Sequence, residues 1–197
     1  MTYSTCEPLR LDSIPTWYNG VLFRSRLEAR WAIFFDLCGF RWDYEPQGFE
    51  IDGVQYLPDF RLYNVVRRID SEHDSADKPF FVEVKGVMDE ASREKIWRLS
   101  RYYPVYVVGE VPFPKGPDDY FRAIVEQFFE DVIFFSYNTI DGDSYPAGLF
   151  LNDQGRPEIA GPDHELGGLD MERTMEALRM AGRARFDQRR PPLIRLA

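Results

Sequence analysis

A glutamate and a lysine lie two residues apart in an otherwise apolar stretch, PFFVEVKGVM at residues 79–88. The run from 80 to 85 predicts a strand, and because strand side chains alternate between faces, Glu83 and Lys85 project on the same side. Charges within an apolar strand are costly unless they are paired, bind a metal or reach water. The two residues are therefore either an ion pair at the surface of a sheet or part of a reactive site.

Two further carboxylates are candidates for the same site. Asp59 follows Pro58, which lacks a backbone N–H and favours an edge or a bulge that can redirect a side chain. Glu28 borders the apolar stripe of an expected helix, although its spacing from Ser25 also fits a capping box. Asp59 alone would be an ordinary turn acid, but its strand leads to the Glu83 strand, and consecutive strands usually neighbour each other.

Three carboxylates and a lysine together suit the hydrolysis of a phosphodiester bond. Oxygen ligands are those that Mg²⁺ or Mn²⁺ prefers, and Mg²⁺ usually keeps water and substrate phosphate among its ligands. A bound ion can activate water, and a nearby lysine can orient that water or offset charge in the transition state. Glu45, which follows Tyr44 and precedes Pro46, is a secondary candidate whose alternative is an ordinary acid at a strand end.

Three segments, SRLEAR, YLPDFRLY and FFVEVKG, carry a family resemblance. They resemble the motifs of the PD-(D/E)XK nuclease superfamily, and most closely those of its small stand-alone phage and bacterial members. The resemblance covers residues 16–110, about half of the chain, and implies a restriction-endonuclease-like core. It implies that Asp59 and Glu83 ligate the metal. It also implies that Lys85 positions or activates the water and that Glu28 binds the metal directly or through water.

A phosphodiester substrate needs cations along its path. The candidates for phosphate contacts are Arg24, Arg26 and Arg30, at the start of the expected helix, where backbone N–H groups also favour phosphate. The alternative is a solvated helix face. The same two interpretations apply to the basic residues at 89–101 and to the arginine-rich stretch 173–190, which could also bind acidic residues of its own chain.

The hydrophobic pattern predicts the elements that would position these residues. A helix is expected at 25–38, and strands at 42–51 and 54–64 are expected to meet at the Asp52-Gly53 hairpin turn. The remaining expectations are an irregular lead-in at 1–20, a loop at 65–79, a strand at 80–85, a helix at 88–103, a strand at 104–111, a linker at 112–117, a helix at 118–130, a strand or continued helix at 131–137, a short strand near 147–152 and a final helix at 169–190 ended by Pro191-Pro192.

This order of elements predicts an α/β fold with a central mixed β-sheet flanked by helices. Residues 1–136 are expected to form the core, and residues 137–197 a C-terminal extension that ends in a helix and packs on or beside it. The long charged insert at 65–79 separates Asp59 from Glu83 and would shape access to the site.

Composition narrows the class of protein. Of the 197 residues, 44 % are hydrophobic, which is enough for a real core, and no apolar run is long enough to cross a membrane. The first residues lack a basic start followed by an apolar stretch, so a cytoplasmic location is expected. Two cysteines and two histidines are too few for a disulfide scaffold, a zinc site or a histidine-based triad.

The net charge of −9 is regional, because residues 110–169 hold twelve acidic and three basic side chains. A face that binds nucleic acid therefore remains possible outside residues 110–169. The acidic region itself is a candidate surface for a second copy or a protein partner. We expect a Mg²⁺- or Mn²⁺-dependent DNA nuclease, most simply an endonuclease. The alternatives are a nuclease-fold subunit of a larger DNA-processing, transposition, defence or anti-defence complex, and a non-catalytic DNA-binding protein.

Overall fold

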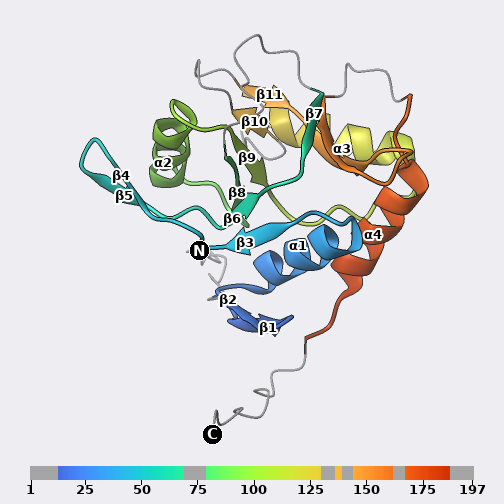
Figure 1. The fold of residues 1–197 in the computed structure, drawn as a ribbon, viewed down its shortest axis with the longest axis horizontal. Coiled ribbons are helices and arrows are strands. Elements are labelled where there is room, and N and C mark those ends of the chain that lie inside the picture. Colours follow the sequence, from blue (N-terminus) through green and yellow to red (C-terminus); the bar gives the residue numbers. More distant parts are fainter. Residues whose placement is uncertain (1–12, 69–78, 130–135, 139–143, 162–166, 187–197) are drawn as a thin grey trace, which may run out of the picture.

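The computed structural model describes residues 13–68, 79–129, 136–138, 144–161 and 167–186. Figure 1 shows helices and short strands arranged around a central sheet. In chain order the elements are β1 (Thr16–Tyr18), β2 (Val21–Phe23), α1 (Arg26–Leu37), β3 (Trp42–Tyr44), β4 (Phe49–Ile51), β5 (Val54–Tyr56), β6 (Phe60–Leu62), β7 (Val66–Arg68), β8 (Phe80–Val84), α2 (Glu90–Ser100), β9 (Val105–Val108), α3 (Pro117–Phe129), β10 (Ser136–Asn138), β11 (Ser144–Pro146), β12 (Gly148–Leu151), β13 (Pro157–Ala160) and α4 (Met171–Arg183).

The central sheet is mixed and has the strand order β11-β10-β9-β8-β6-β3. Strands β8 and β9 run parallel, while the other neighbours are antiparallel. Every residue of β8 and β9 is buried, as the continuous apolar runs FFVEV and VYVV predict for central strands. The expected α/β architecture with a central mixed sheet is therefore confirmed.

Different elements cover the two faces of this sheet. Phe60 on β6 packs against Phe35 of α1 with ring centroids 5.2 Å apart, whereas Phe81 on β8 packs against Phe49 of β4 at 5.3 Å. Phe81 pairs with the residue after Phe60, so the two rings point to opposite faces. Figure 1 accordingly shows α2 and the β4–β5 hairpin on one side and α1 with α4 on the other.

The C-terminal elements share the core of the central sheet. Strand β13 pairs antiparallel with β12 and parallel with β7, which makes a separate three-stranded sheet. Leu149 of β12 and Leu178 of α4 are fully buried in the same hydrophobic cluster as Trp31 and Phe60. Strand β10 spans position 136, the predicted boundary between core and extension.

The predicted hairpin turn between β4 and β5 is present. Ile51 pairs with Val54, and Asp52 and Gly53 between them have φ angles of 50° and 75°. Positive φ at both positions is what a two-residue Asp-Gly turn requires. The Asp-Gly signal was therefore sufficient to place this turn.

The two long strands expected around that turn are each divided. Strand β3 pairs with β6 in the central sheet, while β4 pairs with β5 outside it. Pro46 and Pro58 lie in the two breaks, and neither has an N–H to donate to a ladder. Figure 1 shows the β4–β5 hairpin extending away from the central sheet, next to α2.

Three expectations are wrong. The lead-in at 1–20 is not irregular throughout, because β1 pairs with β2 across Asn19 and Gly20, both at positive φ. The loop at 65–79 includes β7, whose partner β13 lies far along the chain and leaves no local signal. The final helix ends at Arg183, followed by Ala184 with an extended ψ of 129°, rather than at the Pro191-Pro192 pair, which lies outside the described residues.

Other expected elements are confirmed to within a few residues: the helices now seen as α1, α2 and α3, and the strands β8, β9 and β12. Of the segment 131–137, only residues from 136 on are described, and these begin strand β10. Within the described parts of the chain, no helix is both long and apolar enough to span a membrane.

Candidate active site

Asp59, just before β6, lies beside Glu83 on the neighbouring strand β8. In the antiparallel pairing of β6 with β8, Phe60 faces Val82 and Leu62 faces Phe80. Asp59 directly precedes β6, and continuing this register by one residue sets it against Glu83, on the face that opposed residues share. The two acids that the sequence predicts as partners are therefore brought together.

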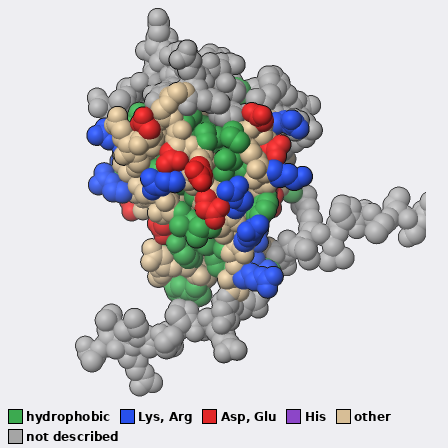
Figure 2. All heavy atoms as spheres, turned by 90° about the vertical axis from the view of Figure 1, so that its right-hand side faces the viewer, with side chains coloured by type: hydrophobic (Ala, Val, Ile, Leu, Met, Phe, Trp, Pro, Cys, Tyr) green, Lys and Arg blue, Asp and Glu red, His purple; other side chains and the backbone are tan. Residues whose placement is uncertain are grey.

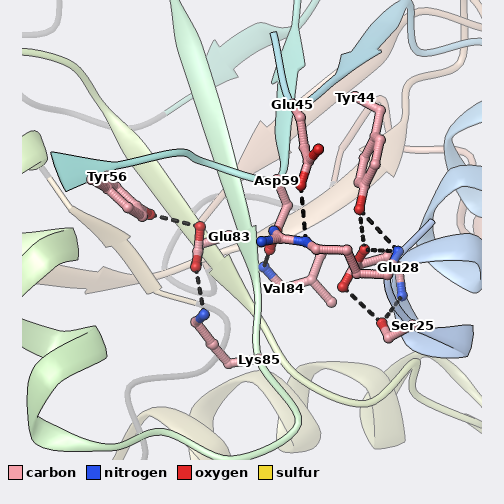
Figure 3. A network of polar contacts seen from close by, with 10 residues as sticks. Ser25, Glu28, Tyr44, Glu45, Tyr56, Asp59, Glu83, Val84 and Lys85 are labelled. Atoms are coloured by element: carbon pink, nitrogen blue, oxygen red, sulfur yellow. Dashed lines mark hydrogen bonds and ion pairs between the residues drawn. The ribbon is translucent and has the colours of Figure 1, made fainter. Parts of the chain in front are cut away.

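The Asp59 carboxylate is fixed by the backbone of the strand that carries Glu83. Its Oδ2 accepts a hydrogen bond of 2.7 Å from the N–H of Val84 (Figure 3), and the residue is only 1 % exposed. Its Oδ1 accepts a hydrogen bond from the Arg24 guanidinium. Both oxygens of this buried acid therefore have donors.

Glu83 and Lys85 share a face, as their spacing predicts. Lys85 Nζ lies 2.7 Å from Glu83 Oε1, and the hydroxyl of Tyr56 donates a 2.6 Å hydrogen bond to Glu83 Oε2. Figure 3 shows this group on one side of Asp59 and Glu28 on the other. Glu83 is buried, so this ion pair is not the surface pair that its spacing alone would also allow.

The Glu28 carboxylate accepts three hydrogen bonds at the start of α1. Its Oε1 accepts from Ser25 Oγ at 2.8 Å, and its Oε2 accepts from the Tyr44 hydroxyl at 2.5 Å and the Arg24 backbone N–H at 3.0 Å. Ser25 also caps the helix by accepting from the Glu28 N–H. Only half of the capping box is present, because the Glu28 carboxylate accepts from the N–H of Arg24 and not from that of Ser25. Glu28 lies beside the Asp59 cluster rather than within it (Figure 3). A role for Glu28 in metal binding stays a prediction.

Arg24 connects the acids of the site. Its Nε lies 2.9 Å from Glu45 Oε1 and its guanidinium contacts Asp59. Glu45 has a positive φ of 46°, unusual for a residue with a side chain, and its N–H bonds the carbonyl oxygen of Asp59. The secondary candidate Glu45 is thus joined to the site, through Arg24 and through the backbone.

Burial and neighbouring charges shift the pKa values of Asp59 and Lys85. Burial, then the charges of Glu83 and Glu28, raises the pKa of Asp59 well above its ordinary value of 3.8, against the opposing effects of Val84 N–H and Arg24. Burial disfavours the charged form of Lys85, but the Glu83 carboxylate outweighs it and raises the pKa of Lys85 above its ordinary value. Lys85 is therefore a protonated cation at neutral pH.

A cleft of about 240 Å³ opens beside the Glu83–Lys85 pair. The β4–β5 hairpin and α2 form its walls. The residues that line it are Arg24, Gln55, Tyr56, Leu57, Glu83, Lys85, Ser92 and Lys95. The cleft thus places three basic side chains and several hydrogen-bonding groups around one carboxylate, which suits an anionic ligand.

Of the three arginines predicted to contact phosphate, Arg24 alone lines this cleft. Arg26 and Arg30 each lie two positions from Glu28 on α1, and helical geometry turns them to the other side of the helix. Arg24 thus lies at the cleft, whereas Arg26 and Arg30 are not brought to it, and a phosphate contact by Arg24 stays a prediction.

The arginine-rich stretch at 173–190 does not form a one-sign surface where it is described. Arg179 pairs with Glu176 at 3.0 Å, and Arg183 stacks over the ring of Phe113. Figure 2 views the molecule from the α3 and α4 side and shows basic and acidic side chains interspersed. Parts of the acidic region 110–169 lie outside the described residues, so its role as a partner surface stays a prediction.

Four lining residues were missed by sequence reasoning as members of the site: Gln55, Tyr56, Leu57 and Ser92. Tyr56 reads as a core aromatic, and the only available signal was its place three residues before Asp59 in the same segment. Lys95 was recognised as a helix cation, but its direction into the cleft depends on how α2 packs. Such residues become visible only when the hairpin and α2 are placed in space.

The donor set has the right chemistry for a hard divalent cation, but it is not assembled as a closed metal site. Asp59 and Glu83 are buried oxygen donors on adjacent strands. Within the described residues, however, no three acidic, histidine or cysteine side chains converge closely enough to hold a metal. Each of the two acids holds a protein cation instead, Arg24 on Asp59 and Lys85 on Glu83.

No protein-family model matches the sequence, and neither the curated proteins nor the solved structures compared with it give a match.

Proposed function

We propose that the protein is a divalent-metal-dependent DNA nuclease with a restriction-endonuclease-like core, acting as an endonuclease. The observation that carries the proposal is the placement of buried Asp59 against the end of β8, where it accepts from the Val84 N–H next to buried Glu83 and the Glu83–Lys85 pair. This arrangement agrees with the resemblance of the sequence segments to PD-(D/E)XK nucleases. The same chemistry would suit Mg²⁺ or Mn²⁺.

Each residue has its own part in the proposed reaction. A divalent ion held by Asp59 and Glu83, with Glu28 nearby, would polarise the scissile phosphate and lower the pKa of a water molecule. Lys85 is protonated, so it orients the attacking water and offsets negative charge as the new oxygen–phosphorus bond forms. The bond from phosphorus to the leaving sugar oxygen would break in the same step. The attacking water would give up its proton to solvent and the leaving oxygen would take one from solvent, which yields one phosphate end and one hydroxyl end.

The walls of the cleft supply the remaining contacts. Lys95 and Ser92 come from α2 and Gln55 from the β4–β5 hairpin, on either side of the Glu83–Lys85 pair. A cation and neutral donors at these positions suit the phosphates that flank a cleavage site. These groups suit the sugar-phosphate backbone, so we propose contacts to the backbone rather than to a sequence.

The test is cleavage of plasmid, linear, single-stranded and branched DNA in Mg²⁺, Mn²⁺ or EDTA. Wild-type protein should cleave only with metal, and Asp59→Asn and Lys85→Gln should each lower the rate by at least about 10²-fold. Asp43→Asn, an exposed acid on β3, is the matched control and should cleave normally. Equal rates in all four proteins would mean that the site is assigned to the wrong residues.

A non-catalytic DNA-binding protein is the second candidate. Arg24 and Lys85 already neutralise the two acids, an arrangement that would also serve a fold kept only for binding. The same experiment separates the two candidates, because a binding protein would retain DNA in a gel-shift assay and leave every substrate intact.

A further inference from the structure

Arg24 is the cation around which the acids of the candidate site gather. Its guanidinium contacts Asp59 and lies 2.9 Å from Glu45, and its backbone N–H donates to Glu28 and to the hydroxyl of Tyr44. Four side chains from three separate parts of the chain thus contact one residue. The hydrogen bonds of its N–H position the Arg24 backbone, and Asp59 and Glu45 position its guanidinium.

The two partners of the central ion pair differ in exposure. Asp59 is 2 % exposed at its side chain and is held by the Val84 N–H, whereas the Arg24 side chain is 53 % exposed. A buried carboxylate is costly without a cation or donors, while a long exposed arginine can leave without breaking any packing in the core. The acid is therefore the fixed partner and the guanidinium the exchangeable one.

We propose that Arg24 is the resident counter-ion of this site and that a divalent ion takes its place on Asp59. This inference rests on the proposed nuclease function. Ion binding at Asp59 and Glu83 releases the guanidinium, which stays anchored beside Glu28 and lines the cleft. Arg24 is then free to contact a substrate phosphate, so metal binding and DNA binding support each other. Arg24 is in this sense a positioning residue for the metal and not one of its ligands.

The exchange explains why the acids are neighbours without forming a closed metal site. With Arg24 on Asp59, one oxygen of that carboxylate is occupied by a charged donor, and the net charge near Glu83 and Lys85 is already balanced. A metal ion must compete with the guanidinium before it can use both acids. Removing the competitor should consequently strengthen metal binding.

The test is Ca²⁺ binding by isothermal titration calorimetry without DNA, on wild type, Arg24→Gln and Lys95→Gln. Since hydrogen bonds between charged groups are worth on the order of tenfold in an equilibrium, Arg24→Gln should bind Ca²⁺ on the order of tenfold more tightly. Lys95→Gln removes the same charge from the same cleft and should tighten binding far less. Equal tightening in both variants would reduce the effect to general electrostatics and overturn the exchange.

A second readout uses thermal unfolding. Without Ca²⁺, Arg24→Gln should unfold at a lower temperature than wild type, because Asp59 loses its cation. Saturating Ca²⁺ should narrow that difference, because the same metal ion then occupies Asp59 in both proteins. A difference that Ca²⁺ leaves unchanged would contradict the inference.

A measurement on the wild-type protein removes any dependence on variant folding. The Arg24 Nε–H resonance, assigned by its loss in Arg24→Lys, should shift when Ca²⁺ is added, and an unmoved resonance at saturating Ca²⁺ would overturn the exchange. If Ca²⁺ binds wild type and Arg24→Gln equally, the inference fails and the nuclease proposal stands. If neither binds Ca²⁺, the metal site itself is absent and both fail.

Discussion

Single side chains in the candidate site are defined by what holds them. Asp59 is held by a backbone N–H, Glu83 by a tyrosine and a lysine, and Glu28 by the start of its own helix. Loss of a supporting contact should therefore impair the site as loss of an acid does.

Tyr56→Phe should weaken the site without removing an acid. The Tyr56 hydroxyl donates to Glu83 at 2.6 Å in a buried setting, and loss of such an outer contact typically costs roughly 10–100-fold in metal affinity or activity. Calorimetry with Ca²⁺ and the rate of plasmid cleavage measure the effect. The control is Tyr106→Phe, which loses a buried hydrogen bond to the Ala147 carbonyl oxygen at 2.8 Å, far along the chain. A similar loss of activity in both variants would contradict the role of Tyr56.

Asp59 should make stability depend on pH in a direction opposite to that of an ordinary paired acid. Its pKa is raised by folding, so the folded state takes up this proton more readily than the unfolded state. The resulting stabilisation is present at low pH and is lost as pH rises through the raised pKa, at most about 1.4 kcal/mol per pH unit. Urea unfolding of metal-free wild type and Asp59→Asn should diverge accordingly, with wild type gaining relative stability toward acid. A constant difference between the two proteins would show that the Asp59 pKa is not raised.

At the scale of elements, the site forms where the start of α1, the ends of β6 and β8, and the walls made by the β4–β5 hairpin and α2 meet. The helix start contributes through its cap, and the walls contribute through the residues that they turn toward the cleft. Each can be tested separately.

Ser25→Ala should disturb both the helix and the site. Ser25 Oγ accepts from the Glu28 N–H and donates to the Glu28 carboxylate, and loss of such a cap costs about 0.5–2 kcal/mol. Asp170→Ala is the matched control, because it removes the cap of α4 at the Arg173 N–H. Both variants should lose similar stability in urea unfolding, but Ser25→Ala alone should slow DNA cleavage. Equal cleavage rates for Ser25→Ala and Asp170→Ala would show that the Glu28 contacts do not contribute to DNA cleavage.

Lys95→Gln should weaken DNA binding in a salt-dependent way. Lys95 lines the cleft from α2, and loss of one phosphate contact lowers the slope of log affinity against log salt by about 1. Fluorescence anisotropy with labelled DNA in Ca²⁺ at several salt concentrations gives that slope. Lys115→Gln, an exposed lysine that lines a different pocket, should leave it unchanged. A slope equal to that of wild type would remove Lys95 from the DNA path.

Elements with strong local signals could be predicted from the sequence. The apolar runs of β8 and β9 and the Asp52-Gly53 turn were sufficient for placement, and the spacing of Glu83 and Lys85 gave their common face. Strand β7 could not be predicted, because VRR carries no strand pattern and its stability comes from β13, far along the chain. The direction of Lys95 and the hydrogen bond of Tyr56 were beyond prediction for the same reason, since both depend on how distant elements pack.

At the scale of the whole molecule, one hydrophobic core joins the candidate site to the C-terminal elements. Phe150 and Leu178 belong to the same cluster as Val82 and Phe60. The C-terminal sheet and α4 therefore stabilise the site indirectly, through α1. We expect the described parts of the chain to unfold together.

Gly148→Ala tests this shared core. A Cβ at Gly148 would lie 2.5 Å from Ile124 Cδ1 and 2.7 Å from the Phe150 ring, which are buried neighbours. Such overpacking costs about 1–3 kcal/mol, and it should shift a single unfolding transition in urea rather than create a second one. Gly116→Ala meets nothing within 4 Å and should change stability by less than about 0.5 kcal/mol. Two separate transitions in Gly148→Ala would show that the C-terminal elements unfold independently.

The most direct measurement is the position of Mn²⁺ in crystals of the wild-type protein, located by anomalous diffraction. We predict one ion in contact with an oxygen of Asp59 and an oxygen of Glu83, with the Arg24 guanidinium turned away from Asp59. An ion bound elsewhere, or crystals in saturating Mn²⁺ in which Arg24 still occupies Asp59 and the cleft holds no metal, would contradict this prediction.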